Sequence, residues 1–548
     1  MQTTVQANAR GGSNYKWTLA AVVILGVFMS ILDQTIVNIA IPRLQAAFGA
    51  DIHSVQWVLT AYILAQGVAT PMAAFFADRL GIKRFYMFSL AAFTAGSALC
   101  GISWSLPVLI FFRVLQGLGG ASLFPLSITL LFREFPPAER GVAMGAFGVP
   151  ALLAPAIGPT LGGYLVTYAD WQFIFYINVP VGIVALILSA LLIREYRSEG
   201  RPSFDFFGCL FVAAGLASLL YALSSASTDG WGSGTVVGFL GVGIFCLLVF
   251  VVVELTIARR GGSPLLDLRL FANGPFRAGV IANLFVIFSL FGGLFLFPIY
   301  LQNLRHLSAF QAGLTLLPQA LASMVSVVIG GRLVDRFGVR TVMIPGLIVL
   351  GIATWELTLL DIYTPYSWFQ FLLILRGLAL GLTVQPLTVA MMSEVHPRQL
   401  AQASSLSTVS RSVSSSLGIA VLATLVQSQS ALHYGHLAEQ VTPFSRLGQV
   451  IFGLQAYFVA HGASLANAHA AALQEISLFI KGQAFILAMQ DAFRFTIITI
   501  VVALIAVFFV RNRTTGRQAR PASEQADLPA GAHADDAAAA EAEALAIG

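Results

Sequence analysis

Asp33 and Arg113 are charged residues within stretches of sequence that are otherwise apolar. A charged side chain deep in a lipid bilayer is costly, and one that is retained there pairs with another group or lies on an ion pathway. An aspartate that alternately holds and releases a proton can couple proton movement to other work, and a neighbouring guanidinium favours its charged form. We therefore predict that Asp33 and Arg113 couple proton movement. The alternative is that Asp33 is a structural partner at a wet helix end.

Glu356 and Arg376 form a second candidate pair inside apolar sequence. With a helical rise of about 1.5 Å per residue, Asp33 and Arg113 lie about 5 Å and 9 Å from the same boundary of their two stretches. The same arithmetic places Glu356 about 22 Å from the start of its stretch. Arg376 lies about 14 Å from the start of the next stretch, which runs in the opposite direction. Each pair thus shares a depth. For Glu356 and Arg376, proton coupling and structural pairing fit the sequence equally well.

The composition indicates which elements must position these residues. Of the 548 residues, 57% are hydrophobic and only 10% are charged, whereas a water-facing exterior needs roughly a quarter charged residues. A soluble enzyme, a secreted disulfide scaffold and a disordered chain are therefore excluded. One helical span of a bilayer takes about 20 apolar residues. The sequence predicts an all-α membrane protein with fourteen spans, at 17–40, 55–76, 85–103, 107–131, 141–166, 173–193, 207–225, 235–257, 276–301, 313–334, 341–359, 367–392, 404–426 and 492–510.

The basic residues predict how the chain is oriented. If the N-terminus is cytoplasmic, most of the 30 lysines and arginines fall in cytoplasmic loops, as the positive-inside rule requires. Both termini are then cytoplasmic, and the net charge of +5 needs no nucleic-acid partner. Between the last two spans, 427–490 is predicted to be a long outer loop with one or two amphipathic helices. The segment 511–548 is predicted to be a disordered tail.

The sequence predicts neither a metal site nor a bound cofactor. The three cysteines lie in apolar runs, and the histidines between 433 and 469 are not spaced like metal ligands. None of the three lysines lies in the Gly-Lys-Ser/Thr context of an ATP-binding P-loop. One charge crossing 100 mV is worth about 2.3 kcal/mol. A proton gradient is therefore the predicted energy source.

A short charged motif occurs twice in the chain. Two arginines inside spans, Arg113 and Arg376, are also repeated, at an offset of 263 residues. The chain is therefore predicted to be a duplication, with two parallel halves and a substrate site between them. The motif copies, at an offset of 257 residues, are Asp78, Arg79, Gly81 and Lys83 in the first half and Gly331, Asp335, Arg336, Gly338 and Arg340 in the second, where Gly331 matches Ala74.

These two motif loops are predicted to gate the protein, because charge pairs between helices can form in one state and break in the other. Glycine permits the tight turn that such a loop needs. The alternative is that the loops only anchor the chain at the inner face of the membrane. Asp33 has no acidic counterpart in the second half, since the sequence from Pro275 to Tyr300 contains no acidic residue.

Proline and glycine are concentrated in the span predicted at 141–166. Small residues let another helix approach closely, and prolines loosen the backbone hydrogen-bond ladder. This span is therefore predicted to bend or to pack closely against a neighbour. The residues concerned are Pro155, Gly158, Pro159, Gly162 and Gly163.

Five segments of the chain carry a family resemblance: Asp33-Gln-Thr-Ile-Val-Asn38-Ile-Ala-Ile-Pro42, the Asp78 to Lys83 loop, Arg113-Val-Leu-Gln-Gly117, Gly158-Pro159-Thr-Leu-Gly162-Gly163, and Trp171-Gln-Phe-Ile-Phe-Tyr-Ile-Asn178-Val-Pro180. They resemble the fourteen-span drug:proton antiporters of the major facilitator superfamily. The resemblance runs to about residue 510. It implies the major facilitator fold with 14 transmembrane helices, neighbouring first and fourth spans, and an antiporter function for the Gly158 to Gly163 motif.

Three further segments resemble one branch of that family, in which the inner-membrane protein is part of a three-part pump. They are Pro264-Leu-Leu-Asp267-Leu-Arg-Leu-Phe271, Ala403-Ser-Ser-Leu-Ser and the long outer loop. This resemblance implies two partners, a periplasmic membrane-fusion adaptor and an outer-membrane channel, with 427–490 as the contact.

The resulting domain prediction has five parts: a cytoplasmic N-terminus at 1–16, a six-helix bundle at 17–200, two inserted transmembrane helices at 201–262, a second six-helix bundle with a long periplasmic loop at 263–510, and a cytoplasmic tail at 511–548.

We expect a proton-driven multidrug efflux antiporter of the bacterial inner membrane, not an enzyme, that exports lipophilic, cationic or neutral, toxic compounds by alternating access. The alternative is a proton-coupled transporter of a specific metabolite or nutrient. A membrane sensor or enzyme would need a catalytic cluster or a soluble domain, and the sequence indicates neither. The cavity is expected to be lined by polar or aromatic residues within spans, namely Gln34, Asn38, Tyr62, Gln66, Gln116, Asn283, Gln302 and Gln385.

Overall fold

The computed structural model describes residues 13–196, 205–361 and 364–510, and every regular element in these ranges is a helix. Most of the predicted N-terminal segment 1–16 and the whole predicted tail 511–548 lie outside the described residues. The first half of the chain contains α1 (Ser13–Phe48), α2 (Ile52–Ala69), α3 (Met72–Leu80), α4 (Ile82–Gly101), α5 (Leu106–Gly120), α6 (Leu123–Glu134), η1 (Pro137–Glu139), α7 (Arg140–Tyr168), α8 (Phe173–Tyr176) and α9 (Asn178–Leu192).

Two inserted helices follow, α10 (Phe206–Asp229) and α11 (Gly234–Arg259). They pack on each other, and α10 also packs on α2 and α17. The second half contains η2 (Leu268–Ala272), α12 (Gly274–Ile299), η3 (Tyr300–Leu304), α13 (Ala309–Phe337), α14 (Val339–Glu356), η4 (Leu357–Leu359), α15 (Tyr366–Gly381), α16 (Val384–Ser393), η5 (Pro397–Gln399), α17 (Leu400–Glu439), α18 (Arg446–Ala460) and α19 (Leu465–Phe508).

The described residues contain 11 helices that are long and apolar enough to cross a membrane, or up to 13 if each of two bent helix pairs is one span. The sequence predicted fourteen spans, and the one that does not meet this measure is 85–103, which falls in α4. This helix is rich in Ser, Thr, Ala and Gly and packs against α5 and α9. It therefore depends on protein neighbours more than on lipid.

One bent pair is formed by α2 and α3, which meet at 56° around Pro71. The other lies within α7, which bends by 43° between Pro155 and Thr160. Proline removes a backbone donor and crowds the preceding turn, so a bend at these positions is expected. The bend predicted for the proline-rich span is therefore confirmed.

The two motif loops form matching turns. Gly81 ends α3 with φ of 94°, and Gly338 ends α13 with φ of 87°. A residue with a Cβ rarely adopts this left-handed region, so glycine is needed at both positions. The 257-residue repeat in the sequence thus corresponds to one backbone turn made twice.

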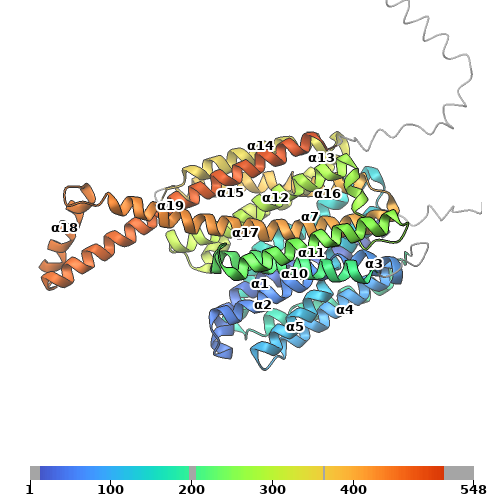
Figure 1. Cartoon of the computed structure of the whole chain (residues 1–548), viewed down its shortest axis with the longest axis horizontal. Coiled ribbons are helices and arrows are strands. Elements are labelled where there is room, and N and C mark those ends of the chain that lie inside the picture. The colour runs from blue at the N-terminus through green and yellow to red at the C-terminus, as the bar shows by residue number, and fades with distance from the viewer. Residues whose placement is uncertain (1–12, 197–204, 362–363, 511–548) are drawn as a thin grey trace, which may run out of the picture.

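The helices form one elongated bundle, and α18 lies beyond one of its ends (Figure 1). We call this the α18 end. The opposite end, called the terminal end here, contains the start of α1, the last turn of α19 and the Gly81 and Gly338 turns. Lys16 of α1 forms an ion pair there with Glu139.

The segment between the last two predicted spans is more helical than expected. Both α17 and α19 continue past the bundle, and α18 joins them at the tip (Figure 1). A small core of Ile451, Ala472, Ile476 and Ile480 holds α18 against α19. The predicted loop at 427–490 is therefore a protruding helical hairpin with a third helix at its tip.

Candidate functional site

Asp33 lies within α1, and its carboxylate is completely enclosed by protein. Arg113 on α5 donates from Nη1 to Asp33 Oδ2 at 2.6 Å, and both side chains are 0% exposed. Gln116 and Asn178 donate from their amide nitrogens to Asp33 Oδ1, each at 2.9 Å. These three donors, from α5 and α9, offset the cost of burying the negative charge.

Arg113 is positioned by groups from three helices. Its Nε donates to the backbone oxygen of Val58 on α2 at 2.9 Å, and its Nη1 also donates to Gln116 Oε1 at 2.8 Å. The guanidinium carbon lies 4.2 Å from the ring centroid of Tyr62, within cation–π range. Its Nη2 is buried and has no hydrogen-bond partner among the described residues. The pair therefore has fixed geometry and is shielded from solvent.

Two residues of this network had no predicted function. Asn178, at the start of α9, donates to Ser97 Oγ at 3.1 Å as well as to Asp33. Ser97 on α4 in turn donates to the backbone oxygen of Phe175 at 2.9 Å. The sequence contained a signal for Asn178, because an amide inside an apolar run needs a polar partner just as a carboxylate does.

The residues predicted to line a cavity do not form one group. Gln116 belongs to the Asp33 network, and Tyr62 is buried beside Arg113. Gln34, the residue after Asp33 on α1, donates to Gln66 Oε1 at 2.7 Å. Asn38 is exposed on α1, one turn beyond Gln34, and donates to its backbone oxygen at 3.5 Å. The other three lie on elements of the second half: Asn283 is buried in α12, Gln302 is exposed in η3 and Gln385 is buried in α16.

Arg376 on α15 is also 0% exposed, but no carboxylate of the described residues pairs with it. Its Nη1 donates to Thr354 Oγ1 at 2.9 Å, and its Nη2 donates to the backbone oxygen of Ser289 at 2.7 Å. In the part of the chain that the structure describes, Glu356 forms no ion pair with it. Residues two apart on a helix point about 200° apart. Since Thr354 faces Arg376, Glu356 faces away.

The second motif loop links the two halves of the chain. Asp335, on α13, accepts hydrogen bonds from the backbone N–H groups of Gly141 at 2.8 Å and Val142 at 2.9 Å. These N–H groups are at the start of α7, where they have no partner within their own helix and where a negative charge is favoured. At Gly331 the two backbones touch, because an added Cβ would lie 2.3 Å from the Gly141 oxygen.

One basic residue of each loop binds a helix end within its own half. Lys83 Nζ donates to the backbone oxygen of Ala190 near the end of α9 at 2.7 Å. Arg340 Nη2 donates to those of Phe508 at 2.5 Å and Val510 at 2.6 Å, at the end of α19. A cation is favoured at a helix C-terminus. Asp78 is half-buried on α3, and Arg79 and Arg336 are exposed beside Phe75 and Phe337.

The bent helix α7 packs on two different partners. Towards the terminal end, Gly141, Gly145 and Gly148 lie against α13 and α16. Past the middle, a Cβ at Gly158 would lie 2.2 Å from Thr35 Oγ1, and one at Gly162 would lie 2.8 Å from Ile36 Cγ1. The close packing predicted for this motif therefore occurs against α1. Gly163 has no described neighbour within 4 Å of its added Cβ, while Pro155 and Pro159 lie at the bend of the helix.

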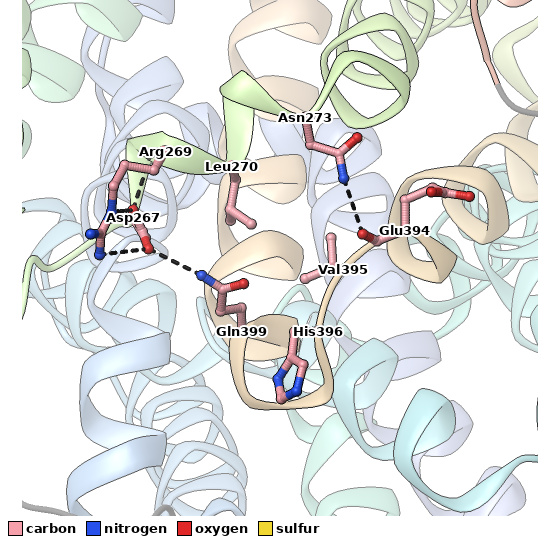
Figure 2. Close-up of a pocket in the computed structure, with 8 residues that line it drawn as sticks. All are labelled: Asp267, Arg269, Leu270, Asn273, Glu394, Val395, His396 and Gln399. Atoms are coloured by element: carbon pink, nitrogen blue, oxygen red, sulfur yellow. Dashed lines mark hydrogen bonds and ion pairs between the residues drawn. The ribbon is translucent and has the colours of Figure 1, made fainter.

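Away from Asp33, a cavity of about 400 Å³ opens at the terminal end, between η2 and the start of α17 (Figure 2). Asp267 pairs there with Arg269 at 2.8 Å and accepts from Gln399 Nε2 at 3.1 Å. Asn273 donates to the backbone oxygen of Glu394 at 3.1 Å. Because most of its lining is polar, this cavity does not suit a lipophilic ligand, and we assign it no function.

The sequence matches the Major Facilitator Superfamily profile over residues 23–419. The chain is 32% identical to the multidrug export protein EmrB of Escherichia coli K12, covering 78% of this chain and 83% of that protein. It is 34% identical to the multidrug resistance protein B homolog of Mycobacterium tuberculosis H37Rv, covering 75% and 76%. The uncharacterized MFS-type transporter YhcA of Bacillus subtilis is 33% identical, covering 81% and 82%.

Two solved structures share the fold at low sequence identity. The human organic anion transporter MFSD10 gives a TM-score of 0.56 at 14% identity, covering 88% of this chain and 99% of that one. A bacterial homolog of the lysosomal transporter Spinster gives 0.51 at 15% identity, covering 91% and 98%. Given its sequence match, its relatives and its all-helical fold, this chain belongs to the Major Facilitator Superfamily, a family of membrane transporters and not of enzymes.

Proposed function

We propose that this protein is a proton-driven exporter of lipophilic toxic compounds that works by alternating access, of the type represented by the fourteen-span drug:proton antiporters. The observation that carries the proposal is the buried Asp33–Arg113 ion pair, with Gln116 and Asn178 as further donors to Asp33. Relatives named as a multidrug export protein and a multidrug resistance protein, at 32% and 34% identity, support the choice of substrate. No cofactor is part of the proposal, because the proton gradient supplies the energy.

Protonation of Asp33 would act on three helices at once. The protonated carboxyl has no charge to offer Arg113, so the bonds at 2.6 and 2.9 Å lose the strength that the negative charge gives them. Their weakening loosens α1 from α5 and α9. The proton thus changes the packing of α1, the element that carries Asp33.

A shift of α1 is transmitted to the second half through α7. Thr35 and Ile36 follow Asp33 closely in the chain and contact Gly158 and Gly162 of α7. The other part of α7 contacts α13 of the second half and is capped by Asp335. A shift of α1 therefore acts on the contact between the halves through one continuous set of packed groups. This is the physical link between proton and gate that we propose.

The test is substrate accumulation in everted membrane vesicles under an imposed pH gradient, acid inside. We expect Asp33→Asn to abolish gradient-dependent accumulation of a lipophilic dye, because the amide cannot exchange a proton. Glu356→Gln is the matched control, since it makes the same change at a carboxylate that is not paired with Arg376. Full gradient-dependent transport by Asp33→Asn would refute the proposal.

The same vesicles separate export from the alternative of metabolite uptake. An exporter accumulates the dye inside everted vesicles when their interior is acidic, whereas a proton-coupled importer accumulates its substrate when the outside is acidic.

We further propose that the terminal end is cytoplasmic and that the membrane is the bacterial inner membrane. The basic residues Lys16, Lys83, Arg340 and Arg398 at that end support this orientation.

We also propose a periplasmic adaptor, and through it an outer-membrane channel, as partners of the protruding hairpin. Its apolar side chains Phe444, Phe452, Tyr457 and Leu465 are 93%, 57%, 56% and 67% exposed. Large exposed apolar side chains at a tip are typical of an interaction surface. Co-purification of a co-expressed adaptor should be lost when the tip, residues 440–464, is replaced by a short polar linker. Unchanged co-purification would contradict the proposal that the hairpin binds an adaptor.

A further inference from the structure

One face of α17 is polar and points towards the first half of the chain. Ser404, Thr408, Arg411 and Ser415 follow each other at intervals of four, three and four residues, which places them on one face of the helix. Two contacts fix its direction. Ser404 Oγ lies 2.9 Å from Thr129 Oγ1, and the guanidinium carbon of Arg411 lies 4.9 Å from the ring centroid of Phe124. Both partners are on α6.

Arg411 differs from the other two arginines inside the bundle. Arg113 and Arg376 are 0% exposed and donate to protein acceptors. Arg411 is half-buried, and among the described residues it makes no hydrogen bond or ion pair. Its nitrogens are also not enclosed, in contrast to Arg113 Nη2 and Arg376 Nε. They are therefore within reach of a ligand.

No carboxylate of the described residues neutralises the charge of Arg411. Asp33 is already engaged by Arg113, Gln116 and Asn178. A guanidinium in apolar surroundings is costly unless it is paired, and it presents a rigid fork of donors that matches an acidic group. The position lies about 16 Å from the start of α17, which is mid-depth in the bundle.

The neighbouring side chains suit an apolar ligand body. Phe124 packs edge-on against Phe147, with 5.2 Å between the ring centroids. The hydroxyls of Thr408 and Ser415 lie on the same face of α17, on either side of Arg411 along the helix axis. An acidic group at Arg411 can therefore be joined to an aromatic body beside Phe124.

We propose that Arg411 is the binding site for the carboxylate or sulfonate of a lipophilic organic anion, held between α17 of the second half and α6 of the first. This rests on the proposed function and narrows its lipophilic substrates to organic anions, in place of the cationic or neutral compounds expected from the sequence. Because the site joins helices from both halves, a bound anion also bridges the interface that opens and closes during transport.

The test is binding of three pyrene probes to the full chain in nanodiscs. Pyrenebutyrate, pyrenebutanol and a pyrenebutyl trimethylammonium salt share one aromatic body and differ only in the charge of the head group. The wild-type protein should bind the butyrate about tenfold more tightly than the alcohol, as one charge-assisted contact predicts. Arg411→Gln should abolish this preference while leaving affinity for the alcohol unchanged, and Arg411→Lys should keep part of it.

Arg277→Gln is the control, because it removes an exposed arginine of α12 that has no place in this site. It should leave the order of the three affinities unchanged. Chloride and inorganic phosphate at physiological concentration should not displace the butyrate. Displacement by either would identify an inorganic-anion site and overturn the proposal for organic anions.

Two outcomes separate this inference from the proposed function. If the wild type shows no preference for the butyrate, or if Arg411→Gln weakens all three probes equally, the anion site is wrong while proton-driven export stands. If the preference is present and depends on Arg411 but no probe moves under a pH gradient, the anion site stands and the proposed function fails.

Discussion

Arg113 and Arg376 occupy corresponding places in the two halves, and among the described residues only the first has a carboxylate partner. Both are fully buried, on α5 and α15. Arg113 bonds to Asp33 of α1, whereas Arg376 bonds to the backbone oxygen of Ser289 on α12 and to Thr354 on α14. The two halves therefore share the buried arginine but differ in its partner, which is a titratable side chain in the first half and backbone and hydroxyl groups in the second.

Gly293 shows how the second half accommodates its buried arginine without a matching aspartate. An added Cβ at Gly293 on α12 would lie 2.4 Å from Arg376 Nη2, so the guanidinium occupies the space that a side chain would need. The arginine lies against the bare helix and reaches the Ser289 carbonyl. One half thus holds a group that can exchange a proton, and the other holds a fixed contact of similar shape. On the function proposed above, coupling would belong to the first half and a fixed helix contact to the second.

The largest expected effect is the contrast between Arg113→Met and Arg376→Met. Loss of Arg113 leaves the buried Asp33 without its counter-ion, which costs about 3–5 kcal/mol. Loss of Arg376 leaves a carbonyl and a hydroxyl with one partner fewer, which costs about 1–3 kcal/mol. Thermal unfolding of the purified proteins in one detergent measures the difference. Equal destabilisation of the two variants would show that the halves do not differ in this way.

A smaller effect is expected at the α1–α7 contact. Gly158→Ala places a Cβ 2.2 Å from Thr35 Oγ1 and should cost about 1–3 kcal/mol through overpacking. It should also reduce gradient-driven transport, because α1 must move against α7. Gly163→Ala is the matched control, since its Cβ meets no described atom within 4 Å. If both variants transport dye equally well, the proposed link from Asp33 to the gate is wrong.

The smallest effect is expected at the motif loops. Asp335→Asn removes a negative charge from the start of α7 and leaves one acceptor for two N–H groups, a loss of about 0.3–1 kcal/mol. We expect a larger population with α7 and α13 separated at the terminal end. Spin labels at the exposed positions Ala138 and Phe337 report this distance.

Arg340→Gln is the comparison for this variant, because Arg340 binds the end of α19 within the second half. It should leave the label distance unchanged. An equal shift for both variants would mean that the distance reports general loosening of the helix ends and not the contact between the halves.

Much of the fold followed from the sequence, because apolar length and turn residues are local signals. The inserted helices α10 and α11 match the spans predicted at 207–225 and 235–257. The tight turns at Gly81 and Gly338 were predicted from the repeat and are present. The span predicted at 85–103 is also a helix, α4, although its many small and polar residues weaken its apolar signal.

The sequence predicted how deep the site residues lie along their helices, but not which way their side chains face. Helical rise placed Asp33 and Arg113 at one level, and the structure brings them together. The same reasoning paired Glu356 with Arg376, but depth says nothing about which way a helix faces. Thr354, two residues earlier, is the partner that faces Arg376. The long-range packing that fixes helix rotation is not readable from one sequence.

The inserted helix α10 packs on both α2 of the first half and α17 of the second. Trp231, between α10 and α11, donates from Nε1 to Thr424 Oγ1 of α17 at 2.9 Å. Under the alternating access proposed above, the two halves move relative to each other, so α10 cannot keep both contacts unchanged. The two inserted helices would then limit how far one half can turn against the other.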